Sequence, residues 1–186
     1  MIFTPAKLPG AFVVDIERRR DDRGYFARSW CQREFAAHGL ETNLAQINVA
    51  HSPRSGTLRG LHFQVDPDAE VKLIRCLRGA MYDVIVDLRP DSPTCGRWQG
   101  FEMTAESGRM IYVPEGFAHG YQTLLSDTEM CYHTSQFYAP ASARGIRFND
   151  AVFKIRWPLA VSYISQQDET WADWSVQSAS NLTQVA

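Results

Sequence analysis

The sequence lacks the features that tie a protein to a membrane or to nucleic acid. No apolar run approaches the ~20 residues needed to span a bilayer. At the N-terminus no basic stretch precedes the apolar residues, and Pro5, Pro9 and Gly10 interrupt anything like a signal-peptide core. The 19 Lys and Arg residues nearly balance the 21 Asp and Glu residues, so the net charge of -2 gives no reason to expect nucleic acid or an anionic membrane as a partner. We therefore expect a cytoplasmic protein.

Cysteine is sparse and scattered. Cys31, Cys76, Cys95 and Cys131 form no C-x-x-C pair and have no histidine at metal-site spacing beside them. We expect buried thiols, no metal site and no cofactor.

Helical patterns are missing from the middle of the chain. They predict helices only over 32–40, where Gly39 is a stop signal, and near 165–174, where Ser165 is a candidate N-cap. Between them come short strand-like stretches separated by Gly, Pro, Asp and Ser, at 11–17, 57–64, 71–79, 80–88, 98–104, 109–116, 121–125 and 129–138.

Many short strands without intervening helices are typical of an all-β sandwich or barrel of the jelly-roll type, with short flanking helices. A chain of 186 residues fits one domain. We expect this domain to cover residues 1–174 and to be followed by a polar tail over 175–186.

Strand alternation then groups polar residues with apolar ones. Lys72 and Tyr132 each share a face with apolar neighbours, and His62 shares a face with Gly60. Arg59 falls on the opposite face unless Gly60 marks a bulge. Each residue also has a structural interpretation: a hydrogen-bonded histidine, a lysine that reaches solvent, or a core tyrosine. Together they predict a strand that lines a pocket.

Several stretches carry a resemblance to a known family: "DDRGYF", "QINVAHSPRSGTLRGLHFQ", "VKLIRCLRGAMYDVIVDLRPDSPTCGRW", "IYVPEGFAHGYQTL", "ARGIRFND" and "WP". In this order, from Asp21 to Pro158, they resemble the dTDP-4-dehydrorhamnose 3,5-epimerases. That resemblance implies a cupin-type double-stranded β-helix. It also implies a metal-independent epimerase that inverts C3 and C5 of a nucleotide-linked 4-keto-6-deoxyhexose, in deoxysugar biosynthesis of the dTDP-rhamnose type.

The resemblance assigns four catalytic roles. His62 matches the family's base, oriented by Asp168 through its other ring nitrogen; a histidine suits this role because its unperturbed pKa of about 6.5 lies near working pH. Lys72 matches the cation at the developing O4 oxyanion, and Tyr132 matches the acid that returns a proton to the opposite face. Two groups on opposite faces of a planar enolate are the minimum that an epimerase needs.

The substrate-binding positions of the family match this sequence less completely than the catalytic ones. The matched set comprises nucleotide contacts, diphosphate or sugar contacts and a sugar-pocket aromatic: Arg23, Phe26, Arg28, Gln46, Asn48, Arg59, His119 and Tyr138. Arginine suits a diphosphate because its planar fork can donate two hydrogen bonds. This chain has Arg28 where many members of the family have glutamate, and Gln167 where a lysine is frequent. The resemblance therefore does not decide whether the nucleotide of the substrate is dTDP, CDP or GDP, or which sugar it carries.

Alternatives remain open on these residues. Some relatives epimerise only C3, and others move the keto group between C4 and C3. A metal-dependent cupin would usually present H-x-H, whereas position 60 is glycine here. A non-catalytic sugar-binding jelly roll would have no use for the base, acid and cation together. The resemblance also implies a homodimer, since the family is usually dimeric. Exposed strand edges in a jelly roll, which are often paired across subunits, favour the same expectation.

Overall fold

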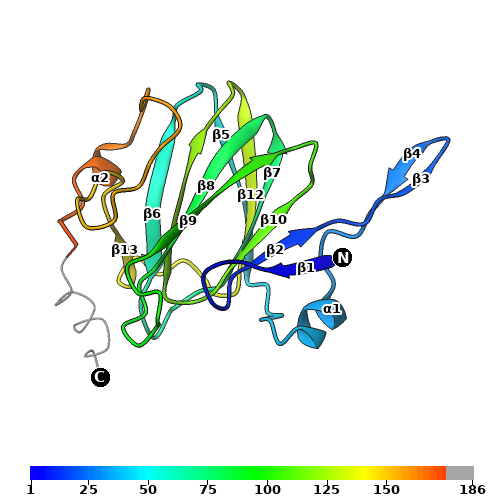
Figure 1. Ribbon diagram of the computed structural model, residues 1–186, viewed down its shortest axis with the longest axis horizontal. Helices are drawn as coiled ribbons and strands as arrows, with labels where there is room; N and C mark the ends of the chain where they lie inside the picture. Colours follow the sequence, from blue (N-terminus) through cyan, green and yellow to red (C-terminus); the bar gives the residue numbers. More distant parts are fainter. Residues whose placement is uncertain (175–186) are drawn as a thin grey trace.

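A computed structural model describes residues 1–174, which form two β-sheets, one projecting hairpin and two short helices (Figure 1). The six-stranded sheet has the spatial order β1 (Ile2–Pro5), β2 (Phe12–Asp15), β10 (Met110–Val113), β7 (Lys72–Arg78), β12 (Thr128–Thr134) and β5 (Gln46–Ser52). The five-stranded sheet has the order β13 (Ala143–Gly145), β6 (Leu58–Gln64), β11 (Phe117–Thr123), β8 (Ala80–Asp87) and β9 (Trp98–Thr104). All pairings of these named strands are antiparallel. The predicted all-β jelly roll is confirmed, while the predicted tail at 175–186 lies outside the described residues.

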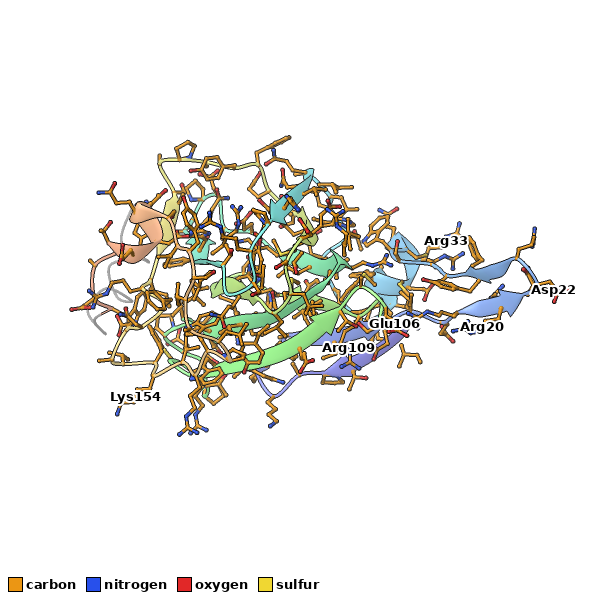
Figure 2. All side chains as sticks on the ribbon, turned by 90° about the horizontal axis from the view of Figure 1, so that it is seen from above. Arg20, Asp22, Arg33, Glu106, Arg109 and Lys154 are labelled. Carbon is orange, nitrogen blue, oxygen red and sulfur yellow. The ribbon has the colours of Figure 1, made fainter. Side chains whose placement is uncertain are left out.

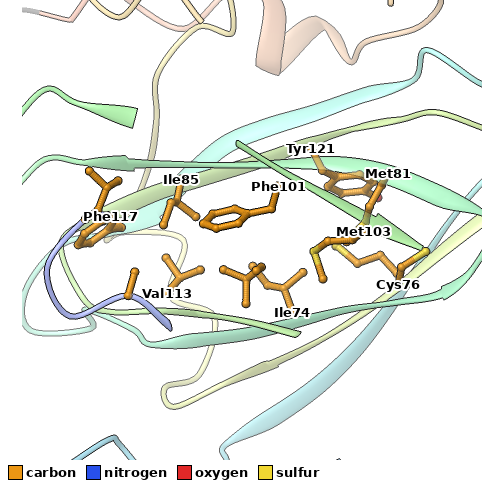
Figure 3. Close-up of a cluster of buried hydrophobic side chains, with 13 residues drawn as sticks. Ile74, Cys76, Met81, Ile85, Phe101, Met103, Val113, Phe117 and Tyr121 are labelled. Carbon is orange, nitrogen blue, oxygen red and sulfur yellow. The ribbon is translucent and has the colours of Figure 1, made fainter. Parts of the chain in front are cut away.

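The main core lies between the two sheets (Figure 3). Strand alternation places Ile74 and Cys76 of β7 in this core, as the sequence predicts. Leu73 points to the other side of the sheet, where it packs near Phe35. Lys72 has the parity of Ile74 and is only 8% exposed, so the alternation that pairs it with the interior is confirmed.

The outer faces of the sheets are covered by the flanking segments. Helix α1 (Gln32–Ala37) places Phe35 against the six-stranded sheet and ends before Gly39, whose φ of +68° suits the end of a helix. The segment after β13 covers the five-stranded sheet with Ile146 and Phe153. This segment leads to helix α2 (Gln166–Glu169), which lies beside β6.

The hairpin of β3 (Arg19–Asp21) and β4 (Gly24–Phe26) stands apart from both sheets. It projects from the rest of the chain in Figure 1, and Figure 2 shows Arg20 and Asp22 on it, far from the sheets. All six strand residues of the hairpin are exposed.

The cysteines correct one expectation. Cys76 is buried, and burial raises the pKa of its thiol to about 11. Cys31 and Cys131 are only partly buried, and Cys95 is exposed at the turn after β8. The prediction of four buried thiols is therefore wrong. Apolar neighbours in the sequence do not determine whether a cysteine is buried when other segments of the fold decide which residues are covered. Among residues 1–174 no helix has the length and apolar character to cross a membrane.

Candidate active site

A cavity of about 560 Å³ opens between the two sheets, a size typical of small-molecule sites. Strands β5, β6, β7, β11 and β12 line it, and α2 closes one side. Nine of the residues predicted from the sequence line this cavity: His62, Asp168, Tyr132, Lys72, Gln46, Asn48, Arg59, His119 and Tyr138.

A bulge in β6 brings Arg59 and His62 to the same cavity. Arg59 pairs with Tyr121 and His62 with His119, so three steps along β6 match two steps along β11. Gly60 permits this geometry: its φ is +123°, and a Cβ there would lie 2.5 Å from the Cα of the facing strand. The sequence analysis left open whether Gly60 marks a bulge, and the structure confirms that it does.

His62 is held by a carboxylate from a distant part of the sequence. Its Nε2 lies 2.6 Å from Oδ1 of Asp168, whose side chain is 7% exposed while that of His62 is 46% exposed. Ser165 caps α2 by accepting a hydrogen bond from the Asp168 backbone N–H, and the Gly60 N–H donates to the other carboxylate oxygen at 3.2 Å. Burial raises the pKa of Asp168, but the hydrogen bonds from His62, Gly60 and Ser165 outweigh it and lower the pKa overall.

This arrangement sets the histidine tautomer. An ionised Asp168 can only accept, so His62 donates from Nε2–H. In the neutral ring, Nδ1 then carries the lone pair, and it makes no hydrogen bond to any residue of the described part of the chain. The pocket thus offers an oriented base with one free nitrogen.

The opposite wall carries a cation and a phenol. Lys72 Nζ lies 3.0 Å from Oε1 of Glu70, and both side chains are 10% exposed, so the alternative that Lys72 reaches solvent is wrong. Tyr132 pairs across the sheet with Ile74, two residues along β7 from Lys72, and therefore faces the same side. Burial, and then the negative charge of Glu70, raise the pKa of Tyr132, which keeps the phenol protonated near neutral pH.

A buried histidine and an exposed arginine also line the cavity. His119 Nε2 is 2.7 Å from Oδ1 of the fully buried Asp83. Arg59 is held by Ser52 Oγ at 3.3 Å and the His51 carbonyl at 3.2 Å. The guanidinium keeps further donors that can face an anion.

The rim of the cavity is polar and aromatic. Gln46 Oε1 accepts a hydrogen bond from the Tyr138 backbone N–H at 2.8 Å, which fixes the segment after β12. The Tyr138 side chain is left 66% exposed beside the opening. Asn48 faces Tyr132 across the β5–β12 pair.

Three predicted substrate-binding residues do not line the cavity. Arg23 and Phe26 belong to the projecting hairpin, where Arg23 pairs with Asp21 at 2.6 Å and Phe26 is 67% exposed. Arg28 follows the hairpin and pairs with Glu34 at 2.9 Å. Within one copy of the chain, these residues form no common site with the base and the acid.

Other residues at the cavity were missed by the sequence analysis, among them Glu70, Tyr121 and Trp171, which line it, and Asp83, which binds the lining residue His119. Two of them had a signal. Glu70 lies two positions before Lys72, and Asp83 interrupts an otherwise apolar strand. Trp171 packs where a Cβ on Gly145 would lie 2.2 Å from its ring, a contact with no signal in the sequence.

Comparison with known proteins decides the family. The profile of the dTDP-4-dehydrorhamnose 3,5-epimerases matches residues 5–175. The chain belongs to this family. Its members are isomerases, and the resemblance noted in the sequence is confirmed.

Individual relatives cover most of the chain. It is 43% identical to the dTDP-4-dehydrorhamnose 3,5-epimerase of Pseudomonas aeruginosa, over 91% of this chain and 96% of that one. The dTDP-4-dehydrorhamnose 3,5-epimerase of Bacillus anthracis, solved with TDP and PPi bound, is 36% identical with a TM-score of 0.90, over 93% and 99% of the two chains. A 3'-monoepimerase of Streptomyces bikiniensis, solved with dTDP-quinovose, is 33% identical with a TM-score of 0.85, over 96% and 89%.

Residues 1–174 contain no group of three or more His, Cys, Asp or Glu side chains placed to hold a metal ion. The expectations of a metal-independent reaction and of no cofactor stay predictions that an analysis of the purified protein can test.

Proposed function

We propose that this epimerase inverts C3 and C5 of a dTDP-linked 4-keto-6-deoxyhexose. The observation that carries the proposal is the pocket itself, which holds an oriented histidine base, a buried lysine and a protonated tyrosine. A sugar-binding protein would need none of these three in one place.

The chemistry follows from the carbonyl at C4. His62 Nδ1 removes the proton from C3 or C5, and the electron pair of that C–H bond moves toward O4 to give an enolate. The ammonium of Lys72 stabilises the negative charge on O4, more strongly in a cavity of low dielectric than in water. The phenol of Tyr132 then donates a proton to the other face of the ring carbon. One C–H bond breaks and one forms; His62 then releases the proton it took to solvent, and Tyr132 regains a proton from solvent.

The nucleotide half of the substrate is assigned to Arg59, with His119 and Tyr138 nearer the sugar. The relatives solved with TDP and with dTDP-quinovose support a thymidine nucleotide. The likeness to a 3'-monoepimerase favours a second candidate, inversion at C3 alone on the same substrate class.

A homodimer belongs to the same proposal. The hairpin residues Arg23 and Phe26 lie outside the cavity of their own chain, and β5, at the edge of its sheet, exposes Ile47 by 61% and Val49 by 60%. In a symmetric dimer each hairpin can enter the cavity of the partner and complete the nucleotide site together with Arg28. The cytoplasmic location stays a prediction from the sequence.

Proton NMR of dTDP-4-keto-6-deoxyglucose in deuterium oxide tests the reaction. We expect deuterium to enter at C3 and C5 and the product to be inverted at both centres. Deuterium at C3 alone would select the second candidate. Exchange at neither carbon, with CDP- and GDP-linked analogues equally unreactive, would contradict the proposal.

Mixing two defective variants tests the dimer. Arg23→Ala lacks the hairpin contact and His62→Ala lacks the base. Random pairing would restore roughly a quarter of the sites, because a mixed dimer has one pocket with both residues intact. A mixture no more active than its components would refute an exchange of hairpins between subunits.

A further inference from the structure

The mechanism above gives no role to the one carboxylate that lines the cavity beside Lys72. Glu70 lies in the segment between β6 and β7, and its carboxylate contacts the Lys72 ammonium at 3.0 Å. Both side chains are 10% exposed, so neither charge is well solvated. Removing two charges from water carries a desolvation penalty, and an apolar pair of similar volume would often serve stability as well. The ion pair therefore calls for a functional explanation.

The geometry of the ammonium supplies that explanation. Lys72 has three N–H donors: one faces Glu70, and a second faces the His62 carbonyl oxygen at 3.4 Å. The third has no acceptor among the described residues and can serve a substrate oxygen. A lysine side chain is long and flexible, so without a fixed partner its ammonium would sample many positions. Glu70 restricts it to the wall that carries the phenol, opposite the wall that carries the base.

We propose that Glu70 is a positioning residue of this site: its carboxylate fixes the Lys72 ammonium for the O4 oxyanion and adds a negative charge beside the Tyr132 phenol. The inference rests on the proposed function and extends it to a residue that touches the substrate only through its neighbours.

The charges around the phenol agree with this role. The other titratable groups that line the same cavity are Arg59 and His62 of β6, Lys72 of β7, His119 and Tyr121 of β11, Arg144 of β13, Asp168 of α2, and Tyr138 and Tyr163 from connecting segments. Burial is the main cause of the raised pKa of Tyr132, Glu70 adds to it, and Arg59 opposes it. Loss of the Glu70 charge therefore lowers the pKa of the acid.

Two variants separate the two parts of the role. Glu70→Ala removes the partner of Lys72, and we expect exchange at C3 and C5 at saturating substrate to slow by about tenfold or more, the loss of one charge-assisted hydrogen bond. Glu70→Gln keeps an acceptor for the ammonium, so it should retain most of the exchange rate. Glu102→Gln, which changes an exposed carboxylate on β9, is the matched control and should behave as wild type.

The titration of Tyr132 tests the second part of the role, the negative charge beside the phenol, while the retained exchange rate of Glu70→Gln beside the loss in Glu70→Ala tests the first. We expect ultraviolet difference titration, with the Tyr132→Phe spectrum subtracted, to show the tyrosinate forming at lower pH in Glu70→Gln than in wild type. An unmoved titration in Glu70→Gln, or a wild-type exchange rate in Glu70→Ala, would overturn the proposal. Because the titration uses no substrate, it tests Glu70 even if the wild type fails to exchange deuterium, which would count against the proposed function alone.

Discussion

Replacing Asp168 with asparagine tests how the His62 tautomer is set. The asparagine side chain has one acceptor, its oxygen, and one donor, its NH₂ group. The Asp168 carboxylate accepts two hydrogen bonds here, from His62 Nε2–H at 2.6 Å and from the Gly60 N–H at 3.2 Å. If the amide oxygen faces Gly60, its NH₂ group faces His62 and forces the ring proton onto Nδ1. The base is then blocked.

The expected loss of rate in Asp168→Asn is worked out from the other orientation of the amide, the one that leaves His62 Nδ1 free. If the amide oxygen faces His62, the buried Gly60 N–H loses its acceptor, which costs about 1–3 kcal/mol. Exchanging a charge-assisted hydrogen bond for a neutral one costs about 1–1.5 kcal/mol more. Since each 1.36 kcal/mol is a factor of ten, the sum of about 2–4.5 kcal/mol slows proton abstraction by about 30- to 2,000-fold.

The assay is deuterium exchange into substrate at saturation, followed by NMR. We expect the loss in the maximal rate rather than in the Michaelis constant. Glu169→Gln, which neutralises the neighbouring exposed carboxylate of α2, is the control and should leave exchange unchanged. A rate for Asp168→Asn within error of the wild type would refute the argument from the tautomer.

Further outcomes are expected from the same geometry. Tyr132→Phe should retain deuterium exchange but lose inversion, because His62 can return deuterium to the same face; equal loss of both would make the tyrosine structural. Arg59→Ala should weaken dTDP binding about tenfold or more in calorimetry, and unchanged affinity would refute its assignment. Gly60→Ala should lower the free energy of unfolding in urea by about 1–3 kcal/mol, because its Cβ would clash at 2.5 Å and its φ is +123°; a neutral effect would contradict the close approach. Because the pKa of Asp168 is lowered by folding, its contribution to stability is present above pH about 4 and is lost as pH falls through the lower folded value, so wild type and Asp168→Asn should converge in stability in strong acid.

Much of the fold and site could be predicted because both depend on local regularities. Alternation along β7 placed Lys72 inward with Ile74, since side chains of a strand alternate strictly between its faces. A glycine inside a strand indicated the bulge that carries Arg59 and His62 to one cavity. The cap at Ser165 was visible as a residue type at a helix start, and it fixes the turn that bears Asp168.

What could not be predicted depends on long-range contacts or on very short elements. The strands of the projecting hairpin have three residues each and bury no side chain, so "DDRGYF" gave no strand signal. The distance of the hairpin from the cavity depends on the tertiary structure and could not be predicted from the sequence. Strand β5 was missed because its inward residues are half-buried and polar, such as Gln46 and Asn48. The pairing of His119 with Asp83 joins two strands 36 positions apart, which alternation alone does not bring together.

The measurement that tests the account most directly is deuterium exchange with His62→Ala beside the wild type, on dTDP-4-keto-6-deoxyglucose in deuterium oxide. The account predicts exchange at C3 and C5 with the wild type and none above the uncatalysed rate at either carbon with the variant, while dTDP binding is retained. Exchange at wild-type rates in a folded His62→Ala protein would contradict the claim that this pocket, with His62 as its base, performs the epimerisation.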